Sequence, residues 1–521
     1  MTTRSTRSTR STRPTRSGQS GRSGQSGRSA LRNLGWNYGG SAAALVVQLG
    51  YTAGTARLVA PDRFGAYAAA LSVMILLGHI SYAGLITPLL RCPALTRSLL
   101  RTARRIATAV GLLCFVSAQA AAPAAARLLG IPDAEPMLRL LSAQFLTHPL
   151  AFTSLCGLRR CGRARPAAAA EVAGQAAGAA TGLALLLCGI APYGIAASLP
   201  VSSACTALIA AHRLTRIPLP DGPPVPIREL IGPSSFFAGY GLMDTAIANA
   251  PLWCVSAVYG PAAVGHYSRA QLLTGIPQNM LLQGIHQTAL PALSESAEDH
   301  RLPRRTVHDL LCTTSAAGFL LFGAVAGAGP DALRLLLGPG WESAGPLVPW
   351  LATGAALSLL CAVGVSVDQA GHAERATLRT QLACILGMLT SLGIAAATHS
   401  LTAVAGATAA GPAAGICAQL WTWRARSAVA LPPLLRAYAV HAAAGCWLGL
   451  AATAGHSVTG GGGPLGALLG AVCALVPAGA ALLMVRERLP VYGVVASRGL
   501  LTRRTGKSPR LTAAATPSPE G

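Results

Sequence analysis

Among the ionisable side chains inside long apolar stretches of this sequence, seven have a chemistry that needs an explanation. They are Arg57, His79, His148, Asp244, Arg269, His286 and Asp368. On insertion scales a charged side chain at the centre of a bilayer costs about 2.5–3.5 kcal/mol, unless it faces water or a partner. Such residues therefore indicate an aqueous cavity, a proton path or a polar tie between helices.

Two of the seven are arginines, whose chemistry suits an anionic ligand. The planar guanidinium binds two phosphate oxygens at once, and the contact is stronger where water is excluded. Arg57 and Arg269 lie near the ends of their apolar stretches, where a long side chain reaching the headgroups is the alternative explanation. We predict that both line a substrate cavity, together with the neutral polar residues Asn249 and Gln278.

Three other residues could couple or switch a transport cycle. Asp244 lies near the middle of its apolar stretch and is followed by Asn249 and Pro251. His79 and His286 can change charge near neutral pH. For each of the three, a hydrogen bond that ties neighbouring helices together is the structural alternative. Asp368, near the end of its stretch, is predicted to occupy an ordinary interface position.

The sequence shows no pattern typical of a catalytic centre. It contains no phosphate-binding Walker loop, no nucleophile elbow and no paired metal-binding histidines. Most of the 13 cysteines fall in apolar runs, and none has metal-ligand spacing. We therefore predict no catalytic residue, no metal site and no cofactor, and a protein that is not an enzyme.

The elements that position these residues are predicted to be membrane-spanning helices. Hydrophobic residues make up 52% of the 521 residues, charged residues only 11%, and the mean hydropathy is +0.48. Soluble domains carry about a quarter charged residues. Apolar stretches of about 18–25 residues recur, a length that crosses the hydrocarbon core as a helix. We predict an all-α integral membrane protein with about 14 transmembrane helices; residues 106–129, 137–157 and 400–421 are three of them.

The net charge of +24 follows the predicted topology and does not indicate nucleic-acid binding. Forty of the 41 basic residues are arginine, and 35 of the 41 fall in the termini and alternate loops. Positive charge in alternate segments marks the cytoplasmic side. We therefore predict a multi-pass protein of the plasma membrane with both termini in the cytoplasm and no nucleic-acid partner.

One turn motif occurs twice in the sequence. The stretch "APDRFGAYAAA" at residues 60–70 and "GPAAVGHYSRA" at residues 260–270 share Pro, Gly, Tyr and Ala at an offset of 200 residues. Two further pairs follow in the same order at offsets of 208 and 209 residues. Six helices therefore repeat in the same sense, which predicts two parallel six-helix lobes plus two C-terminal helices.

These observations predict six segments along the chain. They are a disordered Arg/Ser/Thr-rich cytoplasmic arm at 1–35, an N-lobe of six helices at 36–212, a cytoplasmic linker at 213–230, a C-lobe of six helices at 231–424, two extra helices at 434–485, and a basic cytoplasmic tail at 486–521.

Three motifs resemble one transporter family. "LVAPDRFGAYAAALSV" is similar to a first-lobe segment of polysaccharide and oligosaccharide flippases, the Wzx-type members of the MATE-like MOP exporter superfamily. The stretch from Gly265 to Ser294, with its Gly-x-Tyr-Ser-x-Ala start and Pro-Ala-Leu-Ser end, resembles the second-lobe segment. "LLGPGWESAGPLVPWLA" resembles the family's Leu-Gly-x-x-Trp turn, with Trp341 in place. The resemblance covers residues 31–430.

The resemblance implies alternating-access flipping of a polyprenyl-pyrophosphate-linked oligosaccharide from the inner to the outer leaflet for cell-surface polysaccharide or lipopolysaccharide biosynthesis. It implies membrane lipids as surroundings, H⁺ or Na⁺ as candidate coupling ions, and a polymerase and glycosyltransferases as candidate partners. Many relatives carry an aspartate about nine residues before the second Gly-Pro turn. This sequence has Pro251 there, and Asp244 is the acid that could replace it.

Two alternatives remain open at this point. A MATE-like exporter of small molecules would need an acidic cavity for cationic substrates, and the apolar stretches hold few acids. A membrane scaffold for glycan assembly that does not transport is a second alternative. A deletion strain that accumulates lipid-linked glycan inside the cell separates the flippase from both.

Overall fold

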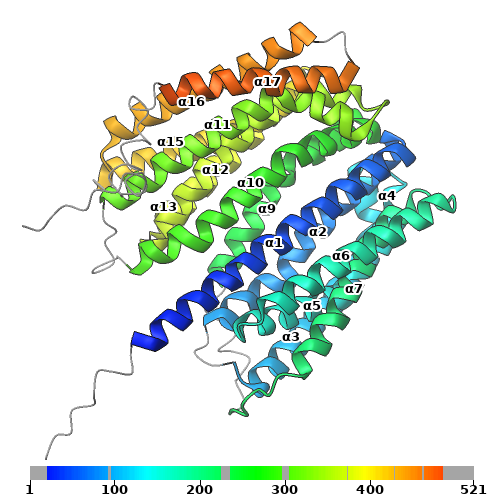
Figure 1. Ribbon diagram of the computed structural model, residues 1–521. Helices are drawn as coiled ribbons and strands as arrows, with labels where there is room; N and C mark the ends of the chain where they lie inside the picture. Colours follow the sequence, from blue (N-terminus) through cyan, green and yellow to red (C-terminus); the bar gives the residue numbers. More distant parts are fainter. Residues whose placement is uncertain are drawn as a thin grey trace, which may run out of the picture. The chain divides into compact units, whose positions relative to one another are not determined.

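The computed structural model describes residues 20–91, 95–223, 235–295, 304–371, 373–426, 429–459 and 463–484. In these ranges the chain forms helices and no strand, as Figure 1 shows. Nine helical segments in the same ranges are long and apolar enough to cross a bilayer. The predicted all-α membrane class is therefore confirmed, whereas the count of 14 transmembrane helices stays a prediction.

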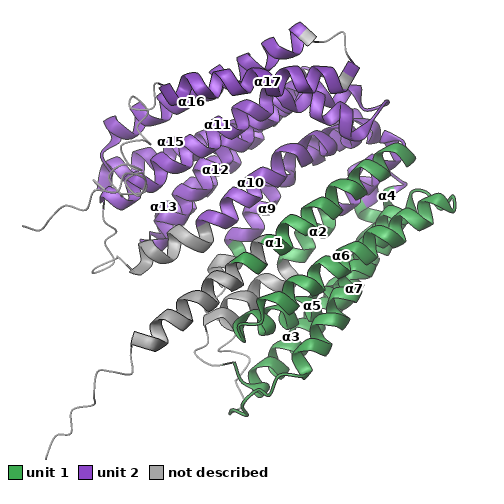
Figure 2. Ribbon diagram, in the orientation of Figure 1, with its two compact units in different colours: residues 1–58, 73–125, 134–239 green, residues 59–72, 126–133, 240–521 purple. Residues whose placement is uncertain are grey.

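The chain divides into two compact units, coloured separately in Figure 2. Unit 1 comprises residues 1–58, 73–125 and 134–239, and unit 2 comprises residues 59–72, 126–133 and 240–521. The helices of unit 1 are α1 (Ser20–Leu58), most of α2 (Pro61–Arg91) and of α3 (Arg97–Leu129), α4 (Ala134–Ser142), α5 (Gln144–Arg160), α6 (Ala164–Leu187) and α7 (Tyr193–Thr215).

Glycines let α6 and α7 approach closely in unit 1. Gly174, Gly178 and Gly182 recur at every fourth residue of α6 and are buried. A Cβ atom on Gly174 would overlap the Thr206 hydroxyl of α7, and one on Gly178 would overlap the backbone of α7. Small residues at helical spacing allow this approach inside a membrane, where apolar burial adds little attraction between helices.

Unit 2 holds the remaining helices. They are most of α9 (Ser235–Tyr259), α10 (Pro261–Glu295), α11 (Arg304–Leu337), the short 3₁₀ helix η3 (Glu342–Leu347), α12 (Val348–Ala370), α13 (Glu374–Ala397), α14 (Leu401–Ala407), α15 (Ala410–Arg426), α16 (Leu431–Thr459) and α17 (Gly463–Met484). Figure 1 shows α16 and α17 beside α11, in agreement with the contacts among these three helices.

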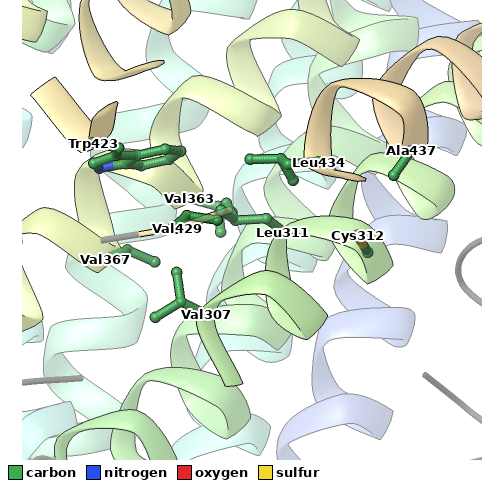
Figure 3. Packing of buried hydrophobic residues seen from close by; sticks show 9 residues of the cluster. All are labelled: Val307, Leu311, Cys312, Val363, Val367, Trp423, Val429, Leu434 and Ala437. Carbon is green, nitrogen blue, oxygen red and sulfur yellow. The ribbon is translucent and has the colours of Figure 1, made fainter. Parts of the chain in front are cut away.

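The contact between α11 and α16 combines close backbone packing with an apolar cluster. A Cβ atom on Gly323 would overlap the carbonyl of Gly445, and one on Gly327 would overlap that of Gly449. Towards the start of α11, Leu311 and other buried residues form the cluster in Figure 3 with residues of α12, α15 and α16. Helix α16, the first of the two extra helices, is therefore part of the core of unit 2.

Two predicted helices are each broken in two. The predicted helix 137–157 consists of α4 and α5, and the predicted helix 400–421 consists of α14 and α15. At both breaks the backbone changes to the tighter i→i+3 pattern, as in the bond from Ala143 N to the Leu140 carbonyl and that from Thr408 N to the Ala405 carbonyl. Proline follows each break, at Pro149 and Pro412, and cannot donate to the carbonyl four residues earlier.

The units differ from the predicted lobes in two respects. Helix α1 begins at Ser20, inside the arm predicted at 1–35, in a stretch that no proline interrupts after Pro14. Residues 1–19 and 485–521 lie outside the described residues. Residues 59–72 and 126–133 belong to unit 2, because Trp253 Nε1 donates to Ser72 Oγ at 2.9 Å and Ser256 Oγ donates to the Leu129 carbonyl at 2.6 Å.

Candidate functional site

The two copies of the repeated turn meet inside unit 2. Helix α2 begins at Pro61 and helix α10 begins at Pro261, so that in both copies the proline opens a helix without needing an N–H donor. A Cβ atom on Gly65 would overlap the Pro261 carbonyl, and one on Gly265 would overlap the Pro61 carbonyl. Each glycine is therefore required because the main chain of the other copy occupies the place of a side chain.

Arg269 is enclosed by aromatic rings beside this contact. Its side chain belongs to α10, and the residue is only 5% exposed. The guanidinium carbon lies 3.6 Å from the centre of the Phe64 ring and 5.7 Å from the centre of the Trp341 ring. A cation held over aromatic faces is stabilised most where water is excluded. Arg269 thus joins the segment 59–72, helix α10 and the turn that precedes η3.

Further aromatic contacts complete this group. The rings of Phe64 and Tyr67 lie 5.5 Å apart, and those of His266 and Trp341 lie 5.6 Å apart in an edge-to-face arrangement. Trp341 is 1% exposed. We call Phe64, Arg269 and Trp341 with these neighbours the aromatic–arginine cluster. In this cluster the Phe64 and Trp341 rings hold the Arg269 guanidinium in place.

Helix α9 carries two further predicted residues. Asp244 is exposed, and Asn249 is partly exposed and donates from Nδ2 to the Thr245 carbonyl at 2.8 Å. Five residues of helix separate them, which turns their side chains to different sides of α9. Asn249 is therefore engaged within its own helix, whereas the role of Asp244 stays a prediction.

The remaining predicted residues are divided between the two units. Arg57 is exposed in the last turn of α1, and His79 of α2 has its Nδ1 atom 3.4 Å from the Ile75 carbonyl; both belong to unit 1. Gln278 of α10 is partly exposed and lies two and a half turns after Arg269, on the opposite side of that helix. His286 also lies in α10, but its side chain is outside the described residues.

Sequence reasoning missed the partners of the buried polar groups. Asp368, predicted at an interface, is instead 5% exposed and accepts a hydrogen bond from Trp423 Nε1 at 2.9 Å. The aromatic enclosure of Arg269 was also missed, although the resemblance placed Trp341 in a motif.

A protein-family model described as "Polysaccharide biosynthesis protein" matches residues 55–346, more than half of the chain. The chain belongs to this family. The match includes the first turn, the second turn and Trp341, so the polysaccharide biosynthesis family segment contains the whole aromatic–arginine cluster.

One curated relative of this polysaccharide biosynthesis family member is the succinoglycan biosynthesis transport protein ExoT of Rhizobium meliloti (strain 1021). The two are 26% identical over 335 residues, which cover 62% of this chain. The aligned part spans 65% of the relative, so the likeness leaves about a third of that protein unmatched.

Solved transporters show a similar fold. The lipid II flippase MurJ in an inward closed conformation aligns with a TM-score of 0.64 at 12% identity, covering 87% of this chain and 99% of that one. An inward-facing multidrug resistance MATE family transporter of the MOP superfamily aligns with a TM-score of 0.58 at 14% identity, covering 74% and 95%. At these identities the likeness concerns the fold, which is that of multi-pass membrane transporters.

Proposed function

We propose that the protein flips a polyprenyl-pyrophosphate-linked oligosaccharide from the inner to the outer leaflet for cell-surface polysaccharide biosynthesis. The observation that carries this proposal is the family match over residues 55–346, which contains both copies of the repeated turn. The name of the relative, a transport protein of succinoglycan biosynthesis, supports the same substrate class. The MurJ-like fold supports alternating access as the mechanism.

The aromatic–arginine cluster is the closed form of one end of the transport path in this proposal. Gly65 and Gly265 bring the two turns into main-chain contact, and Phe64 covers the Arg269 guanidinium. When the turns separate, Phe64 withdraws and the guanidinium becomes available to pyrophosphate oxygens. Because the closed turns leave Arg269 only 5% exposed, closure excludes a large anion from the guanidinium.

The other predicted residues keep, in this proposal, the roles that the sequence suggested. Arg57, Asn249 and Gln278 contribute cationic or neutral polar groups to the substrate path, and Asp244, His79 and His286 bias the switch between states. H⁺ and Na⁺ are the candidate coupling ions, since carboxylate and imidazole groups respond to both charge and pH. The arginine-rich segments and both termini face the cytoplasm, by the positive-inside rule.

Transport by Arg269 variants tests the proposed role. Membrane vesicles or a complemented deletion strain are assayed for outward movement of the lipid-linked glycan, normalised to inserted protein. Arg269→Ala is expected to reduce transport per molecule about 10-fold or more, a loss of about 1.4 kcal/mol or more. Arg269→Lys retains the charge but loses the planar fork, so it is expected to fall in between.

Arg334→Ala is the matched control, because Arg334 is exposed in the last turn of α11 and stands outside the cluster. Equal transport per molecule by Arg269→Ala and the control would refute the role of Arg269. Export of cationic drugs without glycan accumulation in the deletion strain would favour the exporter alternative. Labelling of a cysteine placed at Ser343 from the cytoplasmic side alone would overturn the proposed orientation.

A further inference from the structure

A second group of arginines, none of which belongs to the aromatic–arginine cluster, lines a cleft in unit 1. Arg97, Arg101, Arg104 and Arg105 occupy the first turns of α3 and contribute to the wall of a cavity of about 790 Å³. Their spacing of four, seven and eight residues places them on one side of the helix. We call this cavity the arginine cleft.

The opposite wall of the arginine cleft is apolar. Leu214 at the end of α7 is buried, and Ile217 and Leu219 follow it along the chain. On α3 the lining continues through Leu100 to Leu112, which is 52% exposed. The cleft therefore leads from arginines at one end to an apolar surface about 22 Å further along α3, at 1.5 Å per residue.

The entrance of the cleft is fixed by hydrogen bonds to the segment after α7. Arg97 N donates to the Pro220 carbonyl at 2.9 Å, and Ser98 Oγ donates to the Pro223 carbonyl at 2.6 Å. Thr96 Oγ1 accepts from Leu99 N at 3.2 Å and so caps the start of α3. The arginines thus extend from an anchored helix end.

Little of the positive charge in the cleft is neutralised by the contacts that the described residues make. Arg97 pairs with Asp221 at 3.6 Å, but the two side chains are 56% and 84% exposed, so the pair is weak. Arg104 donates to Ser154 Oγ at 3.1 Å, a neutral group, and its buried Nε atom has no hydrogen-bond partner among these residues. Arg101 and Arg105 are exposed. The cleft is built to attract an anion.

We propose that the arginine cleft binds the phosphate headgroup of an anionic phospholipid from the surrounding bilayer, with an acyl chain along Leu112. The apolar end explains why the ligand is a lipid and not a soluble phosphate. Besides the arginines, the polar side chains that line the cleft among the described residues are Thr108 and Thr215, too few to recognise a glycan. A bilayer phospholipid therefore fits better than the glycan carrier that we propose as the transported substrate.

The positive-inside rule explains basic residues at this end of α3 but requires no particular arrangement. The test must therefore separate a built site from general positive charge. The full-length protein in detergent is offered phosphatidylglycerol or phosphatidylcholine with the same acyl chains, and bound lipid is counted by native mass spectrometry. Preference for phosphatidylglycerol is expected for the wild-type protein.

Three variants decide the proposal. Arg101→Ala with Arg105→Ala is expected to weaken phosphatidylglycerol binding about tenfold, because each change removes a charge-assisted contact. The matched control, Arg304→Ala with Arg305→Ala, removes the same charge from the exposed start of α11 and is expected to change binding less than about twofold. Leu112→Trp keeps every charge and narrows the cleft, so it should also weaken binding.

Equal losses in the two double variants would overturn the proposal, since general charge would then explain binding. So would an unchanged affinity in Leu112→Trp. Geranylgeranyl pyrophosphate serves as a probe for the other lipid phosphate. If the cleft variants lose this probe but keep phosphatidylglycerol, the proposed ligand is wrong and the cleft belongs to the glycan carrier. Elution of every variant as a single folded peak, with Arg101→Lys and Arg105→Lys retaining part of the affinity, excludes misfolding as the cause.

Discussion

The starts of α3 and α11 correspond at the 208-residue offset of the sequence but have different surroundings. Gly130 and Gly338, which follow these helices, are 208 residues apart and have positive φ angles of 69° and 82°. At the same offset Arg104 corresponds to Cys312. Arg104 lines the arginine cleft, whereas Cys312 is 0% exposed within the cluster of Figure 3.

The additional helix α16 accounts for much of this difference. In unit 2, Leu434 and Ala437 of α16 close over Cys312, and His441 continues the contact with Nδ1 2.8 Å from Ser315 Oγ. In unit 1 the arginines of α3 instead border a cavity next to the end of α7. A covering helix requires small or apolar residues, because a buried unpaired charge is costly. A position that no neighbouring helix covers can carry an arginine, whose charge is then available to bind a ligand.

The largest effect is expected when the arginine found near the start of α3 is placed at the corresponding position of α11. Cys312→Arg buries a guanidinium among Leu311, Trp423 and Leu434, and is expected to cost more than about 3 kcal/mol and most of the folded protein. Thr313→Arg, at the exposed neighbouring position, is the control. Size-exclusion yield and melting temperature report the effect; similar melting temperatures for the two variants would contradict it.

The next largest loss of stability is expected when the close backbone contact between α11 and α16 is disturbed. Gly323→Ala drives a methyl group into the Gly445 carbonyl and is expected to cost about 1–3 kcal/mol through overpacking. Gly393→Ala provides the comparison, because Gly393 lies within helix α13 with open space around its Cβ position. Thermal unfolding in detergent measures both. A Gly323 variant as stable as the Gly393 variant would show that α16 is not held by this contact.

A comparable effect is expected where a hydrogen-bonded pair joins α11 and α16 near their ends. His456 Nδ1 lies 2.8 Å from the Asp331 carboxylate, which is 3% exposed, while the imidazole side chain is 40% exposed. His456→Ala leaves a buried carboxylate without this partner, at a cost of about 1–3 kcal/mol. Asp331→Asn removes the charge and should cost less. The reverse order in denaturant or thermal unfolding would argue against burial of the carboxylate as the cause.

The smallest effect on stability is expected for a substitution in the arginine cleft itself. Arg101→Ala should change stability by no more than about 0.5 kcal/mol in phosphatidylcholine, because the side chain is exposed. In phosphatidylglycerol the wild-type protein should gain stability from bound lipid, and the variant should gain less. Paired melting curves in the two lipids measure this difference. An equal gain for both proteins contradicts a role for Arg101 in lipid binding.

The fold class could be predicted because its signals are local. Apolar length indicates membrane helices, and the Pro and Gly positions of the repeated turn indicate where α2 and α10 begin. The breaks within 137–157 and 400–421 were missed, because proline within an apolar run does not show whether a helix bends or stops. The assignment of residues 59–72 to unit 2 depends on Trp253 and Pro261, which lie far along the chain.

The candidate site was harder to predict than the fold. Arg269 could be singled out by its charge in an apolar stretch, but its enclosure depends on Phe64 and Trp341 from distant segments. The arginine cleft could not be distinguished in the sequence from other basic loop segments. Composition alone does not show whether a row of arginines lies against a neighbouring helix, here α7, or is open to water. Both cases require knowledge of which helix lies next to which.

Because of the reciprocal contact at Gly65 and Gly265, each of the two turns restricts which residues the other can carry. Copies of a duplicated segment diverge as each adapts to its own neighbours, but here each copy is the neighbour of the other. A side chain introduced at either glycine would collide with the main chain of the other turn. No second substitution can relieve this collision, because substitutions change side chains and not the main chain. Any side chain at one of the two glycines would therefore require the main chain of the other turn to move, so each turn limits which residues the other can carry.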